Sequence, residues 1–303
     1  MKDTIYFHQA NLVLDVLPII TRDKRFALKG GTAINFFIRP LPRLSVDIDL
    51  TYLPIEEREQ TLRNIDQAMQ NFAKSIEPLA NVEFRRLKEN NLIVGLIVIR
   101  NEARIKIEPN LIIRGSVFPV ETHILIKQAQ DLFEKSVQSE LLSFADLYGG
   151  KMCAALDRQH PRDLFDIKLL LENEGITEKI RQAFIVYLLS HNRPIIELLN
   201  PNPIDLKSMF ELDFRGMTFE PVVLDELEKV RNKLFHLVKY FLSAEERHFI
   251  LSVKSGLPDW SLFPVRAIEK LPAIQWKLKN ILRMPQGRHK TALDRLRKFL
   301  EVK

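Results

Sequence analysis

The stretch "LSVDIDLTYL", residues 44 to 53, places two aspartates one residue apart inside a strand-like run. Apolar and polar residues alternate through it with the period of two that a half-buried strand shows. Asp47 and Asp49 therefore project to one face, about 6.5–7 Å apart at the backbone. Aspartate is a poor strand former, and two like charges at this spacing repel each other. The stretch predicts a strand that holds two carboxylates for a purpose other than its own stability.

One such purpose is to bind a hard divalent cation. Mg²⁺ prefers oxygen ligands and usually keeps places for water and for substrate phosphates. With a third carboxylate, the pair formed by Asp47 and Asp49 can hold two ions about 3.5–4 Å apart, the arrangement used in phosphoryl transfer. The cofactor expected here is Mg²⁺, with Mn²⁺ as a substitute. The alternative interpretation is a strand edge guarded by charge against pairing with another chain.

A glycine turn lies some fifteen residues upstream, where Gly30, Gly31 and Thr32 follow a short apolar strand and precede a helix. Glycines allow the backbone to approach a phosphate, and the first N–H groups of a helix attract anions. Thr32 adds a hydroxyl donor. The turn therefore predicts a site for a nucleoside triphosphate close to the aspartates, although many such glycines only shape turns.

Residues 103 to 110, "ARIKIEPN", supply a candidate for the third carboxylate. Alternation places Glu108 on the polar face of this strand, opposite to its isoleucines. Glu108 is expected to be a metal ligand shared with Asp47, or the base that accepts a proton from an attacking hydroxyl. A surface ion pair with a lysine is the alternative. Arg43 and Ser45 share the acidic face of their own strand, where Arg43 is expected to contact a phosphate and Ser45 to affect substrate position.

The rest of the chain of 303 residues predicts an α+β fold. Helical patterns become dominant from about residue 126, so we expect a catalytic domain over 1–125 and a helical domain over 126–303 that contributes to the cleft for nucleotide and acceptor. The elements expected in the first part are helices over 5–20 and 55–79, a strand and helix start within 25–38, and strands over 81–90, 91–100, 103–110 and 111–118.

Composition narrows the class of protein further. A single cysteine, Cys153, rules out an intrachain disulfide and suits a reducing compartment. No run approaches the roughly 18 apolar residues that a membrane span needs, and no signal peptide is evident, so a cytoplasmic protein without membrane contact is expected. The net charge of +6 is uneven, because residues 277–303 carry nine Lys or Arg against two acidic residues. This basic end predicts either a footprint for nucleic acid or a solvated helix face.

Several of these motifs carry a resemblance to a known family. "LKGGTAINFF" (28–37) followed by "LPRLSVDIDLTY" (41–52) resembles the opening motif of the AbiEii/AbiGii toxin family, within the DNA polymerase β-like nucleotidyltransferase superfamily. "IKIEPN" (105–110) is similar to the strand that carries the third acid in that superfamily. "DLYGGKMCAALDRQHPRDLFDIKLLL" (146–171) is similar to a helical motif with a lysine followed by R-D-x-x-D, which here gives Lys151, Arg162, Asp163 and Asp166.

The resemblance implies a polymerase β-like nucleotidyltransferase domain with a mixed sheet flanked by helices, followed by a helical domain. It implies a Mg²⁺-dependent toxin that transfers a nucleoside monophosphate from an NTP and inhibits growth or translation, in a type IV toxin–antitoxin or abortive-infection system with a cognate antitoxin. The residues expected to be catalytic are Asp47, Asp49, Glu108, Lys151 and Asp166, the first three as metal ligands. Those expected to bind nucleotide are Gly30, Gly31, Thr32, Arg43, Ser45 and Lys151.

The chemistry of the second motif agrees with that assignment. Lys151 offers a mobile point charge suited to a triphosphate. Asp166 lies beyond a helix break at His160-Pro161 and is expected to orient Lys151 or to touch the nucleotide. The alternative is that Arg162 and Asp163 only cap the first turn of a helix.

Three functions remain open for the chain. The first is transfer to RNA, with a tRNA end as the leading candidate, because a basic terminus suits a polyanionic acceptor. The second keeps the chemistry but moves the acceptor to a protein or small-molecule hydroxyl. The third is a catalytically inactive nucleotide- or RNA-binding module.

Overall fold

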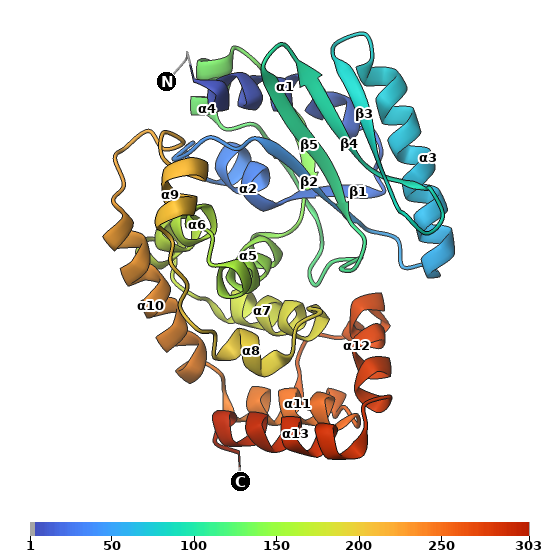
Figure 1. Cartoon of the computed structure of the whole chain (residues 1–303), viewed down its shortest axis with the longest axis vertical. Helices are drawn as coiled ribbons and strands as arrows, with labels where there is room; N and C mark the ends of the chain where they lie inside the picture. Colours follow the sequence, from blue (N-terminus) through green and yellow to red (C-terminus); the bar gives the residue numbers. More distant parts are fainter. Residues whose placement is uncertain (1–3, 303) are drawn as a thin grey trace. The chain divides into compact units, whose positions relative to one another are not determined.

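The computed structural model describes residues 4–302, which form two compact units (Figure 1). Within the described residues, the first comprises 4–147 and Glu211–Val222, and the second comprises Tyr148–Phe210 and 223–302. The first unit runs beyond the border expected at residue 125 because the segment that follows contributes a strand, β7, to its sheet. The division into two domains by role, at residue 125, stays a prediction.

A mixed sheet organises the first unit. In the described part of the chain it has seven strands in the order β3-β4-β5-β2-β1-β7-β6. Strand β2 pairs in parallel with β5 and antiparallel with β1, and β1 pairs in parallel with β7. The strands are β1 Phe26–Lys29, β2 Asp47–Tyr52, β3 Asn81–Arg86, β4 Ile93–Arg100, β5 Ala103–Asn110, β6 Glu121–Ile124 and β7 Gln138–Leu141.

Helices α1 and α3 contact strands at the centre of this sheet. The side chain of Thr4 caps α1 by accepting a hydrogen bond from the N–H of Phe7. Ile48 of β2 and Ile107 of β5 are fully buried. Their neighbours along each strand, Asp47 and Asp49 in β2 and Lys106 and Glu108 in β5, are not. The sheet therefore has one apolar face in the core and one polar face. The helical elements of the unit are α1 Ile5–Ile20, α2 Gly30–Ala33 with a π-helical continuation Ile34–Ile38, α3 Arg58–Ile76 and α4 Lys127–Phe133.

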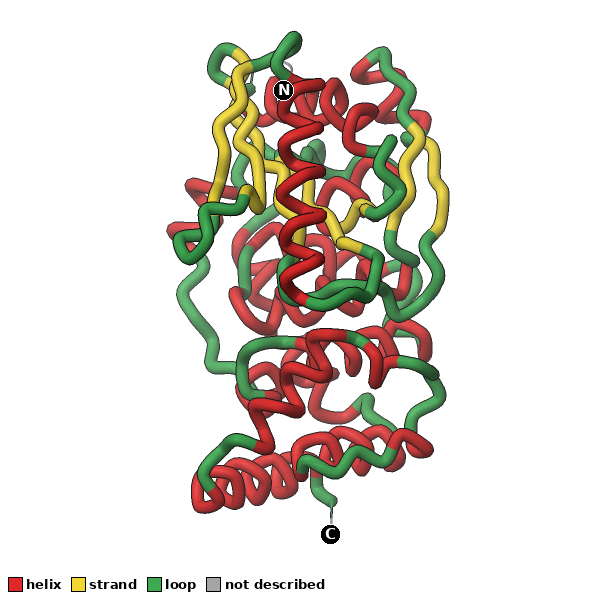
Figure 2. Tube along the Cα trace, turned by 90° about the vertical axis from the view of Figure 1, so that its right-hand side faces the viewer, coloured by secondary structure: helices red, strands yellow, loops and turns green. Residues whose placement is uncertain are grey.

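The second unit consists of helices joined by loops, and its described residues contain no strand. Figure 2 draws these helices in red toward the C-terminus. Helix α5 begins in the first unit and continues into the second, whereas α9 begins in the second unit and ends in the first. The helices are α5 Phe144–Arg158, α6 Pro161–Glu172, α7 Glu178–Ser190, α8 Ile195–Leu199, α9 Lys207–Asp213, α10 Leu224–Tyr240, α11 Ala244–Ser255, α12 Pro272–Leu282 and α13 Gln286–Leu300, with 3₁₀ turns at Trp260–Leu262 and Ile268–Lys270.

The α+β fold class with a mixed sheet is confirmed, and so are the helix over 5–20 and the strand over 103–110. The strand expected over 111–118 is wrong. There the side chain of Asn110 accepts hydrogen bonds from the N–H groups of Ile112 and Ile113, and Gly115 adopts a φ of +78°, so the chain turns. Among residues 4–302, no helix has both the length and the apolar character that crossing a membrane requires.

Candidate active site

The three acids predicted from the sequence lie together on the polar face of the sheet. Asp49 of β2 is the direct partner of Glu108 in the parallel pairing with β5, and Asp47 is the partner of Lys106. Neighbouring strands lie about 4.7–4.9 Å apart, so side chains in register on one face are close neighbours. Because Ile48 and Ile107 point into the core, the acids point the other way. The alternation of the sequence thus placed Asp47, Asp49 and Glu108 on one face correctly.

Basic residues surround these carboxylates and offset their mutual repulsion. Lys29 of β1 pairs in register with Asp49, and Lys106 lies beside Asp47. The third basic residue is Arg85 of β3, whose guanidinium forms an ion pair with Glu108. Glu108 therefore does form a surface ion pair, as in the alternative interpretation, but its partner is an arginine and not a lysine.

The three acids occupy adjacent positions on the paired strands, but their side chains do not converge on one point. Among residues 4–302, no group of three or more Asp, Glu, His or Cys side chains is arranged to hold a metal ion. The donor set nevertheless suits a hard divalent cation, because all three groups are carboxylates on one face of two adjacent strands. Arg85 engages one carboxylate oxygen of Glu108, Oε1, and would compete for it with a cation bound by all three acids.

Both glycines of the turn are held close to this face. Gly30 adopts a φ of +70°, and a Cβ there would lie 3.2 Å from Cβ of Asp49 and still closer to its carboxylate. A Cβ on Gly31 would lie 2.8 Å from a guanidinium nitrogen of Arg43 and 2.9 Å from Oγ of Ser45. A side chain at either position would displace residues that are expected to bind the metal or the nucleotide, which is a steric reason for glycine at both.

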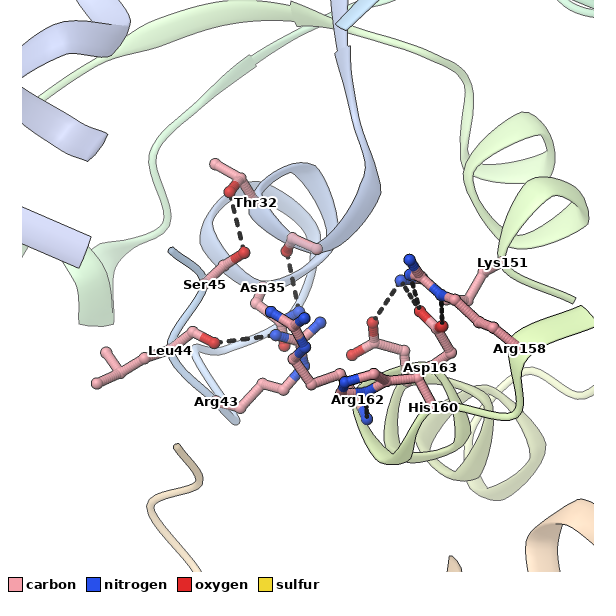
Figure 3. Close-up of polar contacts among 12 residues, drawn as sticks. Thr32, Asn35, Arg43, Leu44, Ser45, Lys151, Arg158, His160, Arg162 and Asp163 are labelled. Atoms are coloured by element: carbon pink, nitrogen blue, oxygen red, sulfur yellow. Dashed lines mark hydrogen bonds and ion pairs between the residues drawn. The ribbon is translucent and has the colours of Figure 1, made fainter. Parts of the chain in front are cut away.

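Polar contacts within the first unit tie the turn to β2 (Figure 3). The hydroxyl of Thr32 lies 3.0 Å from Oγ of Ser45 and in contact with the carbonyl of Asp47. Having one proton, it donates to the carbonyl and accepts from the Ser45 hydroxyl. Arg43 is buried and donates to the carbonyl of Leu44 at 2.9 Å, while the amide of Asn35 donates to the carbonyl of Gly31 at 2.9 Å. Direct phosphate contacts by Thr32, Arg43 and Ser45 stay predictions.

Lys151 belongs to a buried charge cluster of the second unit (Figure 3). Its Nζ lies 2.9 Å from Asp163 and 3.0 Å from Asp166, and all three side chains are buried. Arg158, whose side chain is 58% exposed, donates to Asp163 from outside. Burial alone would raise the pKa of Asp163, but the charges of Lys151 and Arg158 outweigh it and hold that pKa well below its ordinary range. Lys151 is therefore fixed between α5 and α6 and is not the mobile charge expected.

The glycine pair before Lys151 serves packing. A Cβ on Gly149 would lie 2.7 Å from Cβ of Ala183 in α7, and one on Gly150 would lie 3.2 Å from the ring of Tyr187. These glycines let α5 and α7 approach closely. The predicted helix break is confirmed, since α5 ends at Arg158 and α6 begins at Pro161 with His160 as its N-cap.

The basic end of the sequence forms parts of α12 and α13. Arg295, Arg297 and Lys298 are exposed on α13, whereas Leu296 and Leu300 are buried. Lys277 is different, because its Nζ donates to the carbonyls of His191 and Arg193 beyond the end of α7. Burial lowers the pKa of Lys277 to about 8, helped by the charge of Lys254. One of the nine basic residues is thus committed to the fold.

Sequence reasoning missed two residues that contact the expected acids, Arg85 and Arg158. Arg85 shares the period of two of its strand, so alternation gave its face but not its partner. Arg158 lies in the same family-like segment as Lys151 and is five residues from Asp163. Spacing alone does not show a contact that depends on the helix break between them.

Comparisons with known proteins agree with this fold. The family model described as "Nucleotidyl transferase AbiEii toxin, Type IV TA system" matches residues 12–280. The chain belongs to the AbiEii family. A solved structure of MenT4, a nucleotidyltransferase toxin from Mycobacterium tuberculosis H37Rv, resembles it with a TM-score of 0.59 and 14% sequence identity, over 91% of this chain and 92% of that chain. A search of curated proteins gave no match.

Membership in the AbiEii family makes the protein a nucleotidyltransferase toxin of a type IV toxin–antitoxin system. Such a toxin implies an NTP substrate and an antitoxin partner. Nucleotidyltransferases generally use divalent metals. The likeness to MenT4, at its low identity, supports the fold alone.

Proposed function

We propose that this AbiEii protein transfers a nucleoside monophosphate from an NTP to an RNA acceptor, with Mg²⁺ held by Asp47, Asp49 and Glu108. The observation that carries the proposal is the row of the three carboxylates on the polar face of β2 and β5 beside the turn at Gly30 and Gly31. A structural ion-pair network does not need three acids side by side. Nor does it need two adjacent glycines at which an added Cβ would meet the residues of the site.

The residues of the first unit have separate roles in this proposal. Asp47 and Asp49 hold the cation, which when bound neutralises phosphate charge. Thr32 is a positioning residue, because its hydroxyl fixes the start of β2 through the carbonyl of Asp47. The backbone of Gly31, which carries no side chain, and the guanidinium of Arg43 beside it favour binding of the phosphates. In the reaction an acceptor hydroxyl bonds to the α-phosphorus, pyrophosphate leaves, and the hydroxyl proton passes to a base. Glu108 is the alternative candidate for that base, if Asp47 and Asp49 alone hold the cation.

Charge supports an RNA acceptor over a neutral small molecule. Arg104 and Lys106 are exposed on the same face of the sheet as the acids, and Arg295, Arg297 and Lys298 are exposed on α13. Exposed basic groups of this kind bind phosphates and release counterions. A tRNA end is the acceptor we expect. Participation of Lys151 and Asp166 in the reaction is a separate proposal, because both side chains are buried in their own charge cluster.

The test is to follow a label. The full chain is incubated with Mg²⁺, total cellular RNA and each of the four NTPs in turn, labelled at the α-phosphate. The proposal expects label in the tRNA fraction with at least one NTP, none without a divalent cation, and transfer that weakens steeply as salt is added.

Other outcomes are informative as well. Label that moves to protein, or to a small molecule with little dependence on salt, would replace the acceptor but keep the chemistry. No transfer of any label, together with NTP binding detected by titration calorimetry, would indicate a binding module and contradict the proposal.

A further inference from the structure

Arg85 reaches Glu108 across a whole strand. In the pairing of β3 with β4, Arg85 is opposite Gly95. In the pairing of β4 with β5, Leu96 is opposite Ile107, which places Gly95 beside Glu108. Neighbouring strands are about 4.8 Å apart, so the side chain of Arg85 spans two strand spacings, roughly 9–10 Å. The row across the sheet then continues from Glu108 to Asp49.

Two local irregularities favour this path. Gly95 has no side chain under the arginine, and a Cβ there would lie 3.3 Å from Nε of Arg85 and 3.0 Å from the carbonyl of Ile107. The register between β3 and β4 also shifts between Arg85 and Arg86, as in a β-bulge. Bulges are common next to active sites, where they re-aim a side chain. Both features direct the guanidinium of Arg85 toward Glu108.

The ion pair is open to exchange. The side chain of Arg85 is 49% exposed and that of Glu108 is 29% exposed. Ion pairs between groups exposed to water contribute little free energy and are readily replaced by a stronger ligand. While the pair is formed, Oε1 of Glu108 is engaged by the guanidinium, and Glu108 lies in register with Asp49 on the adjacent strand.

We propose that Arg85 is a positioning residue that holds Glu108 until the cation and NTP arrive. The cation displaces the guanidinium from Glu108, and the freed guanidinium binds a phosphate of the NTP, for which its planar array of donors is suited. Arg85 then competes with the cation for Glu108 when NTP is absent and assists it when NTP is present. This inference rests on the proposed metal-dependent function.

Binding of Mn²⁺ without catalysis tests the competition. Free Mn²⁺ is measured by electron paramagnetic resonance with the full chain and no NTP. Replacing Arg85 by Gln removes the competitor, so Mn²⁺ should bind more tightly, roughly two- to fivefold, as expected for one exposed ion pair. The same variant should show a raised KM for NTP with a smaller change in kcat, and Arg85→Lys should restore part of the wild-type KM.

A matched control is available on the same face. Arg104 is similarly exposed and forms an ion pair with Glu83 at 3.3 Å, so Arg104→Gln should leave Mn²⁺ affinity unchanged. Equal or weaker Mn²⁺ binding by Arg85→Gln, relative to the wild type, would overturn the inference and leave Arg85 an ordinary surface partner. A wild-type chain that neither binds Mn²⁺ nor transfers label would instead overturn the proposed function itself.

Discussion

At the scale of single residues, the candidate site is crowded where the sequence has glycine and charged where a core is normally apolar. Gly30 lies against Asp49, and Gly31 lies against Arg43. Lys151 is enclosed by two buried aspartates. These positions have different consequences, because crowding limits substitution by size whereas the buried cluster limits it by charge.

Gly30→Ala tests the crowding. The substitution adds a Cβ against Asp49 at a φ of +70°, so it combines backbone strain with displacement of a proposed metal ligand. We expect a loss of about 1–3 kcal/mol in the free energy of unfolding together with loss of transfer activity. Gly175→Ala is the control, since Gly175 has a φ of +68° and nothing within 4 Å of its Cβ position. Equal destabilisation and full activity in both variants would show that Asp49 does not crowd Gly30.

Lys151→Ala tests the buried cluster. The variant leaves Asp163 and Asp166 buried without their shared cation, which should lower the free energy of unfolding by about 3–5 kcal/mol, measured with urea. Lys168→Ala is the matched control on α6, because Lys168 is partly exposed and pairs with two exposed carboxylates, Glu172 and Glu226, so its loss should cost about 1 kcal/mol or less. A Lys151→Ala protein of unchanged stability and raised KM for NTP would instead favour the direct role in nucleotide binding.

At the scale of elements, the alternation of apolar and polar residues along strands predicted more of the structure than any other pattern in the sequence. It placed Asp47, Asp49 and Glu108 on one face, and β5 begins and ends at the expected residues. The strands β6 and β7 have four residues each, too few for a pattern to emerge, and exist through their pairing. The burial of Lys151 was equally out of reach, because it depends on how α6 folds back after Pro161.

The contact between α12 and the end of α7 predicts a dependence on pH. The folded-state pKa of Lys277 is about 8, below the value of an unfolded lysine, so the folded chain loses its proton first. Between these two pKa values the unfolded state binds more protons, and stability rises with pH. Relative to Lys277→Met, the wild type should gain roughly 2–3 kcal/mol in free energy of unfolding from pH 7 to pH 10. A difference independent of pH would mean that Lys277 stays charged through its hydrogen bonds to the two carbonyls.

At the scale of the whole molecule, the exposed charge bears on the proposed RNA acceptor. The exposed basic side chains of α13 belong to a helix and not to the sheet that carries the acids, so a role for them in RNA binding can be tested separately from the proposed metal site. Arg295, Arg297 and Lys298 changed together to Gln should weaken RNA binding and lower the slope of log K against log salt by roughly 0.7–0.9 for each phosphate that the variant no longer binds. NTP binding should change little.

The control for α13 is a set of three exposed basic residues on another helix. Lys229, Lys233 and Lys239 of α10, changed together to Gln, remove the same number of charges from another helix. If both triple variants bind RNA with the same affinity and slope as the wild type, α13 is only a solvated surface. Equal losses in both would indicate general charge and no specific site on α13.

Label transfer by Asp49→Asn, measured beside the wild type, is the decisive experiment for the proposed metal site. Asparagine keeps the size of Asp49 in its place between Lys29 and Glu108 but removes the charge that binds the cation. With α-labelled NTP, Mg²⁺ and RNA, we expect transfer by the wild type, a loss of at least about a hundredfold in Asp49→Asn, and a thermal unfolding midpoint that is maintained or raised. Undiminished transfer by a folded Asp49→Asn protein would contradict the metal site.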